Sequence, residues 1–350
     1  MYLTALTTKM SEQEPTVEFL VLESQQFPLH ELNDLPNVTR VECRRVPASR
    51  VGRIVYQNTI LPLYLRTIGA DAFLATCNVL PLGCPLPTVV VVQSLQYFDH
   101  RQAFGVIRGA YLRAALKHAS KYSNALICVS ESARRDLVHL TGLNQERVFV
   151  IHHGVSPVIS GYNGVVEPAS PPYILCVATL YRYKNLERLI EAFAMFKRDS
   201  AAQHRLRIIG GPGDMSIEEL ANIAHRFGVG DQVDLPGAVP HLKMANEYAR
   251  ASVFVYPSLA ETFGLPPLEA MAMGVPVVAS RAGPIPEIVG YAAELVDPFD
   301  VGDIARGLGS VLLDSERSQS LIRLGFKRSA EFSWDESARL TFAAIRSVLR

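Results

Sequence analysis

Several features that define particular classes of protein are missing from this sequence of 350 residues. No stretch approaches the roughly 18 consecutive apolar residues of a membrane-spanning helix, and the first residues lack the pattern of a secretory signal peptide. Lysine plus arginine and aspartate plus glutamate number 34 each, so the formal net charge of +0 gives no reason to expect a nucleic-acid partner. These absences lead us to expect a cytoplasmic protein.

The cysteines give no support for a disulfide framework or a metal site. There are five, an odd number, and none of them has C-x-x-C spacing. Cys128 and Cys176 lie within apolar, strand-like runs, where a thiol behaves as a small hydrophobic side chain. We therefore expect reduced, mostly buried thiols and no metal ion.

Apolar, β-branched runs alternate with helical patterns twice along the chain. At 350 residues the chain exceeds the usual size of one hydrophobic core, so two domains are expected. Buried strands are predicted at 17–22, 72–75, 89–92, 126–129 and 148–151, and then at 173–178, 206–209, 232–235, 253–256 and 275–279. Helices are predicted at 107–122, 131–140, 186–197, 218–227, 242–250 and 267–273. The predicted fold class is α/β, with two doubly wound domains.

The segment 256–280 carries the strongest functional signal. An apolar strand leads into a loop, and Pro266 and Pro267 preset the backbone for the first turn of a helix that Gly274 ends. Backbone N–H groups at such a helix start suit an anionic or hydroxyl-rich ligand. The amides concerned are those of Phe263, Gly264 and Leu265.

Two glutamates separated by seven residues bracket this helix start. Glu261 lies on the loop, and Glu269 falls in the predicted first turn, where a carboxylate can accept hydrogen bonds from vicinal hydroxyls. Each has a simpler explanation when taken alone, because loop glutamates are usually solvated and first-turn glutamates often only compensate the helix dipole. Together, with Phe-Gly-Leu-Pro between them, they resemble the Glu-x7-Glu signature of retaining GT-B glycosyltransferases of family 4. The resemblance continues through residues 283–290.

The loops that follow the other strands of the second half are relevant, because ligands of open parallel sheets bind beyond the carboxyl ends of the strands. Arg182 and Lys184 stand beside a predicted helix start with Asn185 as its N-cap, which suits a diphosphate; a pair of solvated cations is the simpler alternative. The glycine-rich loop 210–213 would let backbone approach a ligand closely, although it also fits an ordinary tight turn. Loop 237–240 would offer backbone groups to a nucleobase.

The family resemblance implies a role for each of these positions. Lys184 matches the lysine that binds phosphate, and Glu269 matches the acid that binds ribose. Glu261 and the three amides match the groups around the transferred sugar. Arg182 takes the place of an arginine that the family usually carries where Thr179 stands here. The predicted catalytic residues are thus Glu261, Lys184 and Arg182, and the predicted donor-binding residues are Glu269, Phe263, Gly264, Leu265, Gly210, Gly211, Gly213 and Val239.

The resemblance also implies a GT-B fold, with two Rossmann-like domains facing a cleft. Its expected parts are an acceptor-side domain at 1–160, a linker at 161–172 rich in Gly, Pro and Ser, a donor domain at 173–332, and a helix at 333–350 that crosses back to the first domain. The family opens with a strand and a Gly-Gly loop. This chain begins with what resembles the helix after them, so we expect both to be missing.

Two further features concern the acceptor side. The family usually carries a histidine after the strand that corresponds to 89–92; Gln93 stands there, and His100 lies on the loop nearby. Arg113, Lys117 and Lys121 recur every fourth residue on a predicted helix, with Arg108 close by. Such a basic face suits anionic lipid headgroups if the acceptor is lipid-linked, and a merely solvated helix face is the simpler alternative. A peripheral contact with the inner face of the membrane is therefore kept as an alternative.

The family resemblance therefore implies a retaining, metal-independent hexosyltransferase. It would move a sugar from a nucleotide diphosphate sugar, its co-substrate, to a hydroxyl of a glycan or lipid-linked glycan in cell-surface polysaccharide synthesis, with no cofactor. Two alternatives stay open: a sugar phosphorylase or epimerase of the same fold, and a catalytically impaired donor-domain protein that acts as a partner or scaffold. A nicotinamide oxidoreductase is disfavoured, because no G-x-G-x-x-G follows a strand with an acid at the appropriate distance.

Overall fold

The computed structural model describes residues 2–26, 28–162, 164, 167 and 169–349. Two compact units are present; the first comprises Met1–Phe98, Val106–Gly154 and Ser333–Arg350, and the second comprises Asp99–Gly105 and Val155–Phe332. The predicted linker 161–172 falls partly outside the described residues. Within the described chain, no helix has the length and apolarity needed to cross a bilayer.

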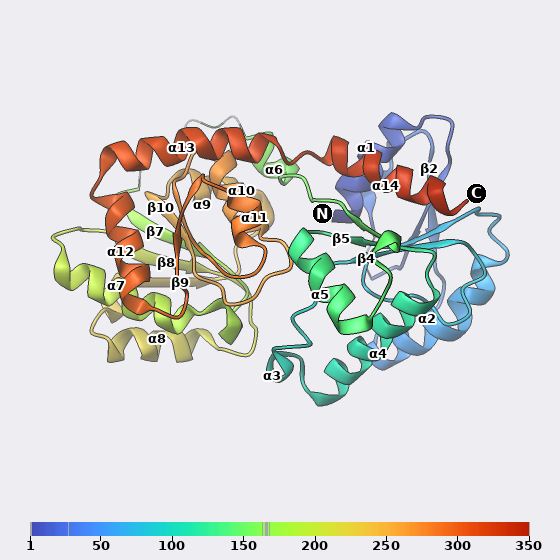
Figure 1. Ribbon diagram of the computed structural model, residues 1–350, viewed down its shortest axis with the longest axis horizontal. Coiled ribbons are helices and arrows are strands. Elements are labelled where there is room, and N and C mark those ends of the chain that lie inside the picture. The colour runs from blue at the N-terminus through green and yellow to red at the C-terminus, as the bar shows by residue number, and fades with distance from the viewer. Residues whose placement is uncertain (1, 27, 163, 165–166, 168, 350) are drawn as a thin grey trace. The chain divides into compact units, whose positions relative to one another are not determined.

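The second unit is a parallel six-stranded sheet with the order β12-β11-β10-β7-β8-β9 (Figure 1). The order reverses between β7 and β10, which makes the space beyond their carboxyl ends the topological switch point of a doubly wound domain. The strands are β7 (Tyr173–Val177), β8 (Arg205–Ile209), β9 (Val233–Gly237), β10 (Val253–Tyr256), β11 (Val277–Ser280) and β12 (Ala293–Val296). The predicted α/β class is confirmed, but edge strand β12 was not predicted.

Helices cover both faces of this sheet. On one face α7 packs against α8 and α12; on the other α10 packs against α9 and α13. The bounds are α3 (Arg101–Phe104), α6 (Pro157–Ser160), α7 (Leu186–Asp199), α8 (Ile217–Arg226), α9 (Met244–Ala249), α10 (Leu265–Ala272), α11 (Ile285–Val289), α12 (Val301–Leu312) and α13 (Ser315–Ala330). The apolar stripe of α7 is fully buried, and each such side chain contributes about 1.5–3 kcal/mol of hydrophobic stabilisation.

The first unit contains two separate parallel sheets where one doubly wound sheet was expected. One sheet pairs β1 (Phe19–Glu23) with β2 (Val38–Glu42), which was not predicted, and the other has the order β3-β4-β5-β6. The strands of the second sheet are β3 (Phe73–Ala75), β4 (Thr88–Val92), β5 (Ala125–Cys128) and β6 (Val148–Val150). The helices of the unit are α1 (Tyr2–Gln13), α2 (Arg50–Leu65), α4 (Val106–Tyr122), α5 (Glu131–Thr141) and α14 (Trp334–Val348).

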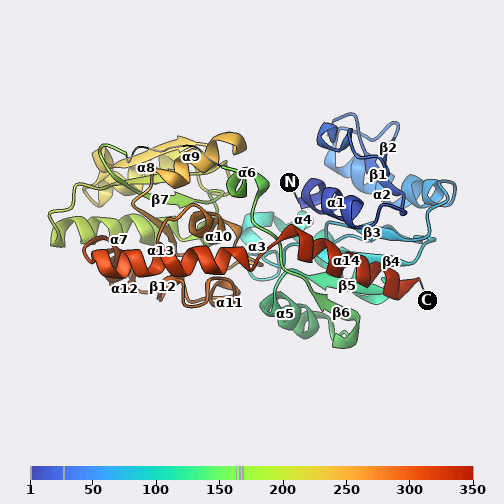
Figure 2. The same ribbon diagram turned by 90° about the horizontal axis from the view of Figure 1, so that it is seen from above.

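One apolar cluster joins the two sheets of the first unit. Helices α1 and α14 pack side by side (Figure 2). They bury Leu6 and Trp334 in this cluster, against which Phe19 of β1 and Leu74 of β3 both lie. Gly154 permits the close approach of α14, because a Cβ at this position would lie 2.4 Å from the backbone nitrogen of Trp334. Packing therefore holds together two sheets that share no hydrogen-bonded strand pair in the described residues.

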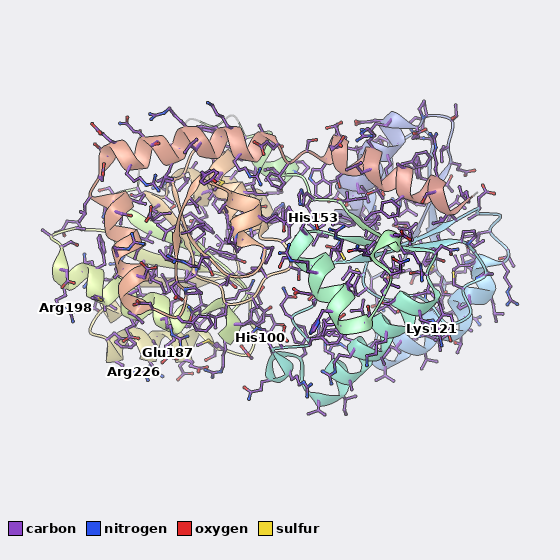
Figure 3. The ribbon with its side chains drawn as sticks, viewed as in Figure 1. His100, Lys121, His153, Glu187, Arg198 and Arg226 are labelled. Carbon is purple, nitrogen blue, oxygen red and sulfur yellow. The ribbon has the colours of Figure 1, made fainter. Side chains whose placement is uncertain are left out.

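A histidine is buried at the same place in the first unit. The His153 ring, labelled in Figure 3, lies 4.9 Å from the ring of Tyr2 and 5.7 Å from that of Trp334, and its Nε2 is 3.0 Å from Oε1 of Gln93. Burial, together with the neighbouring charge of His152, lowers the pKa of His153 from 6.5 to about 3. The imidazole is therefore neutral in the folded unit at any physiological pH.

His153 should make the first unit sensitive to acid. Below pH 6.5 the unfolded chain takes up a proton that the folded unit does not accept until about pH 3. The free energy of unfolding should consequently fall by about 1.4 kcal/mol per pH unit through this interval because of His153 alone. Denaturant unfolding of the wild type and of His153→Gln at pH 7, 6, 5 and 4 measures this contribution. Equal pH dependence in the two proteins would contradict it.

Candidate active site

Three side chains form a closed hydrogen-bonded group at the switch point of the second unit. Nζ of Lys184 lies 2.5 Å from Oε1 of Glu261 and 3.0 Å from the hydroxyl of Tyr256, and that hydroxyl donates to the same Glu261 oxygen at 2.7 Å. The Lys184 and Glu261 side chains are only 11% and 9% exposed. A buried ion pair pays a large desolvation penalty, so its geometry must be held by its surroundings. The predicted residues Lys184 and Glu261 are thus brought together.

The loops after β7 and β10 are locked to one another by backbone contacts. The carbonyl of Tyr183 accepts hydrogen bonds from the Leu259 amide at 2.8 Å and from Oγ of Ser258 at 3.3 Å. The Asn185 side chain donates to the carbonyls of Pro257 at 3.1 Å and Pro298 at 2.6 Å. Asn185 holds the predicted N-cap position of α7, but it adopts φ 63° and makes no side-chain capping hydrogen bond, and its amide bridges the loops instead.

Glu269 lies on α10, the helix that follows the loop after β10. It is only 8% exposed, and its Oε2 accepts a 2.8 Å hydrogen bond from the hydroxyl of Tyr248 on α9. Burial raises the pKa of Glu269, and the phenol hydrogen bond partly offsets this effect. The helix begins at Leu265, two residues earlier than predicted, so Glu269 lies in the second turn and the predicted first-turn position is wrong.

The start of α10 is built as predicted from glycine and two prolines. Gly264, at φ 112°, is the N-cap, and Pro266 and Pro267 occupy the first turn without any N–H to contribute. Among residues 264–267, only Gly264 and Leu265 can therefore offer backbone donors. Phe263 has a structural part here as well, since its buried ring packs edge-on against Phe332 at 6.0 Å.

Arg182 does not join Lys184 at the buried group. Its exposed guanidinium pairs with Glu219 of α8 at 2.6 Å, and its backbone N–H donates to Asp214 at 2.7 Å. It lines a polar surface depression together with Glu187 and Arg226, which pair with each other and are labelled in Figure 3. Arg182 and Lys184 thus have different partners here, and their joint role in phosphate binding stays a prediction.

The glycine-rich loop 210–213 meets protein backbone at close range. A Cβ at Gly210 would lie 1.8 Å from the carbonyl oxygen of Ala178, and one at Gly213 would lie 2.3 Å from that of Leu180. These two glycines therefore let the loops after β7 and β8 pack together. Gly211 has an ordinary contact distance to its nearest neighbour, and Val239 is half-buried after edge strand β9, so a ligand role for both stays a prediction.

Gln93 and His100, the two residues near the position of the family's usual histidine, have different surroundings. Gln93 pairs with buried His153 in the first unit. The His100 ring lies 5.0 Å from that of Tyr183 in the second unit, next to α3. In the described chain no three His, Cys, Asp or Glu side chains converge on a metal position, and metal-independent chemistry stays a prediction.

Sequence reasoning missed the two tyrosines that contact the glutamates. Tyr256 is the last residue of β10, where a tyrosine fits an ordinary strand, and Tyr248 lies on the short helix α9. Their alignment with Glu261 and Glu269 depends on tertiary packing and leaves no local pattern. The one available signal is that a buried tyrosine hydroxyl usually needs a polar partner.

Two family models match nearly the whole chain. The model described as glycosyl transferases group 1 matches residues 163–328, and the model described as glycosyltransferase family 4 matches residues 1–158. The first covers the switch point and both glutamates, and the second covers the first unit up to its last strand.

Individual relatives agree with these matches. O-antigen chain mannosyltransferase B of Escherichia coli is 28% identical over 253 residues, which are 68% of this chain and 65% of that protein. Serotype-specific mannosyltransferase WbdA of E. coli is 27% identical over 238 residues, covering 65% of this chain but only 29% of its own length. Sucrose-phosphate synthase from Thermosynechococcus elongatus has the same fold, with a TM-score of 0.76, 19% identity and coverage of 98% and 92% of the two chains.

Replacing Glu269 with glutamine should stabilise the fold at neutral pH. The pKa of Glu269 is raised by burial, so its contribution is most favourable below pH 4.5 and declines as the carboxylate ionises at higher pH. The amide of Glu269→Gln keeps an acceptor for Tyr248 and carries no charge. Thermal unfolding at pH 8 should show a higher Tm for the variant, and the difference should shrink at pH 4. A lower Tm for the variant at both pH values would contradict the prediction.

Proposed function

This chain belongs to the GT-B glycosyltransferases of group 1 and family 4, and we propose that it transfers a hexosyl residue from a nucleotide diphosphate sugar to a hydroxyl of a glycan or lipid-linked glycan. The proposed transfer retains the anomeric configuration and needs no metal ion or other cofactor. Its proposed setting is cell-surface polysaccharide synthesis, in the cytoplasm at the inner face of the membrane.

The observation that carries this proposal is the buried ion pair of Lys184 with Glu261 at the switch point, together with a second buried acid, Glu269, on the helix that follows. Lys184 supplies positive charge at Glu261 on the loop that leads into α10, and the amides of Gly264 and Leu265 at the start of that helix add partial positive charge. A diphosphate is the ligand group that such an arrangement suits. Glu269 would accept hydrogen bonds from the ribose hydroxyls, and Glu261 would contact the transferred sugar.

The proposed reaction assigns the chain an electrostatic role. The bond between the anomeric carbon and the diphosphate oxygen breaks, and its electron pair leaves with the diphosphate. The acceptor oxygen bonds to the anomeric carbon, and its hydroxyl proton passes to the departing diphosphate. Lys184 stabilises the charge that develops on the leaving group, which is the task that a metal ion performs in other transferases.

The relatives narrow the choice of first substrates. Both E. coli relatives named above are mannosyltransferases, so a mannosyl donor is the first sugar nucleotide to test. The chain spans less than two thirds of each of them, and the donor, acceptor and linkage are therefore matters for assay. A panel of nucleotide sugars, with phosphate as an alternative second substrate, separates a transferase from a phosphorylase or an epimerase.

Substitution of the two glutamates should separate donor binding from turnover. Glu269→Gln removes a charge-assisted hydrogen bond to the ribose and should weaken nucleoside diphosphate binding by about 1.5–3 kcal/mol. Glu261→Gln keeps a hydrogen-bonding side chain at the sugar and should lower transfer while leaving nucleoside diphosphate affinity nearly intact. Calorimetric titration with UDP and GDP, and transfer assays with the matching sugar nucleotides, measure the two effects.

Both measurements should be made with and without a metal chelator. Transfer that survives the chelator supports metal independence, and abolished transfer would show that Lys184 and the α10 amides are insufficient. Wild-type affinity in well-folded Glu269→Gln would remove the ribose assignment. Equal losses of affinity and turnover in Glu261→Gln would point to a structural role for that residue.

A membrane contact through α4 is the second part of the proposal. Lys117 and Lys121 are exposed on this helix, and Val106 and Ile107 at its start are 87% and 88% exposed. Exposed apolar side chains on the same helix as exposed lysines suit an interface with anionic lipids. Arg113 lies off this face, because it is half-buried and donates to the carbonyl of Tyr97 at 3.2 Å.

Charge reversal on α4 should release the protein from anionic vesicles. The variant Lys117→Glu/Lys121→Glu should lose most sedimentation with vesicles containing phosphatidylserine, since each basic residue near such a surface contributes about 1 kcal/mol. Arg198→Glu/Arg226→Glu changes the net charge equally at exposed sites of the second unit and is the matched control. Equal loss in both variants would indicate a general charge effect, and no binding by the wild type would support a merely solvated helix.

A further inference from the structure

Each of the two glutamates in the site receives a hydrogen bond from a buried phenol. The Tyr256 hydroxyl donates to Oε1 of Glu261 at 2.7 Å, and the Tyr248 hydroxyl donates to Oε2 of Glu269 at 2.8 Å. The two tyrosines come from different elements, β10 and α9, and the ring of Phe254 lies 5.6 Å from that of Tyr248 and 6.0 Å from that of Tyr256. Two equivalent contacts are thus built around one aromatic core.

Both phenols are fixed donors. Tyr248 and Tyr256 are almost fully buried, so their rings cannot turn without disturbing the packing of the sheet. Burial and the adjacent carboxylates raise the pKa of both phenols well above 10, which keeps each hydroxyl protonated. Nζ of Lys184 donates to the Tyr256 oxygen, so the Tyr256 proton is directed at Glu261.

The hydrogen bonds engage only one oxygen of each carboxylate. Lys184 and Tyr256 both bond to Oε1 of Glu261, and Tyr248 bonds to Oε2 of Glu269. In the part of the chain that the structure describes, Oε2 of Glu261 and Oε1 of Glu269 accept no hydrogen bond from protein. One oxygen per acid is therefore oriented by the protein, and the other is left to accept from a ligand hydroxyl.

We propose that Tyr256 and Tyr248 are positioning residues that hold Glu261 and Glu269, respectively, with one carboxylate oxygen turned toward the donor substrate. This inference rests on the proposed transferase function and extends it to two residues outside the Glu-x7-Glu segment. When a diphosphate draws Lys184 away from Glu261, Tyr256 keeps the carboxylate in place. Tyr248 does the same for Glu269, which pairs with no cation among the described residues.

Removal of the Tyr256 hydroxyl and removal of the Tyr248 hydroxyl should therefore affect different kinetic quantities. Tyr256→Phe keeps the ring and releases Glu261, so kcat should fall about tenfold while UDP or GDP affinity stays near the wild-type value. Tyr248→Phe releases Glu269, so UDP or GDP affinity should fall about tenfold while kcat at saturating sugar nucleotide stays near the wild-type value. In each variant the retained quantity shows that the site has folded.

Tyr173→Phe is the matched control for loss of a buried phenol. Tyr173 is a buried residue of β7 whose hydroxyl donates to the backbone carbonyl of Glu247 at 2.7 Å; among the described residues it makes no hydrogen bond to Glu261 or Glu269. Its removal should leave both kcat and nucleotide affinity unchanged. The 350-residue chain is used throughout, and thermal unfolding of all three variants compares their stabilities.

The split between the two variants decides the assignment. If both variants behave like Tyr173→Phe, or if both lose kcat and affinity to the same extent together with Tm, the tyrosines are merely structural and the assignment is overturned. A wild-type chain that neither binds UDP or GDP nor transfers sugar would overturn the proposed function and this assignment with it. Normal wild-type behaviour without the split would overturn the assignment alone.

Discussion

The buried ion pair between Lys184 and Glu261 is the contact on which the rest of the candidate site depends. It joins the loops after β7 and β10, the two strands between which the sheet order reverses. Removing two charges from water is expensive, so the pair is tolerated only where its geometry is excellent and other polar groups complete it. Tyr256 completes the pair directly, while the Tyr183 carbonyl and Asn185 fix the two loops that carry it.

The glycines of the loop after β8 help to fix the backbone of the same site. Gly210 and Gly213 allow the loop after β8 to contact the backbone after β7 at distances that no side chain would permit. The backbone that carries Lys184 is thus confined by the loops after β8 and β10. A site confined in this way is preorganised, because little conformational entropy remains to be lost when a ligand binds.

The parts of this structure that follow local rules could be predicted from the sequence. The apolar stripe of α7 and the β-branched run of β10 identified their elements, and Gly264, Pro266 and Pro267 identified the start of α10. Edge strands β2 and β12 were missed, since strands exposed on one side contain polar residues that weaken the signal. The partners of Arg182, Asn185 and Glu269 were missed because they come from other elements, and Tyr256 was missed although it stands only five residues before Glu261. Only the assembled sheet brings these groups together.

The two prolines at the start of α10 have a consequence for ligand discrimination. An ordinary helix start offers up to four amides and attracts anions of many shapes, whereas this one offers only those of Gly264 and Leu265. The negative charge of a ligand therefore contributes little to its binding at this helix start unless its oxygens are correctly placed. A bound molecule must place individual oxygens opposite two fixed N–H groups, one ammonium and two half-engaged carboxylates. The prolines thus shift selection from the total charge of a ligand to the spacing of its hydroxyls and phosphates.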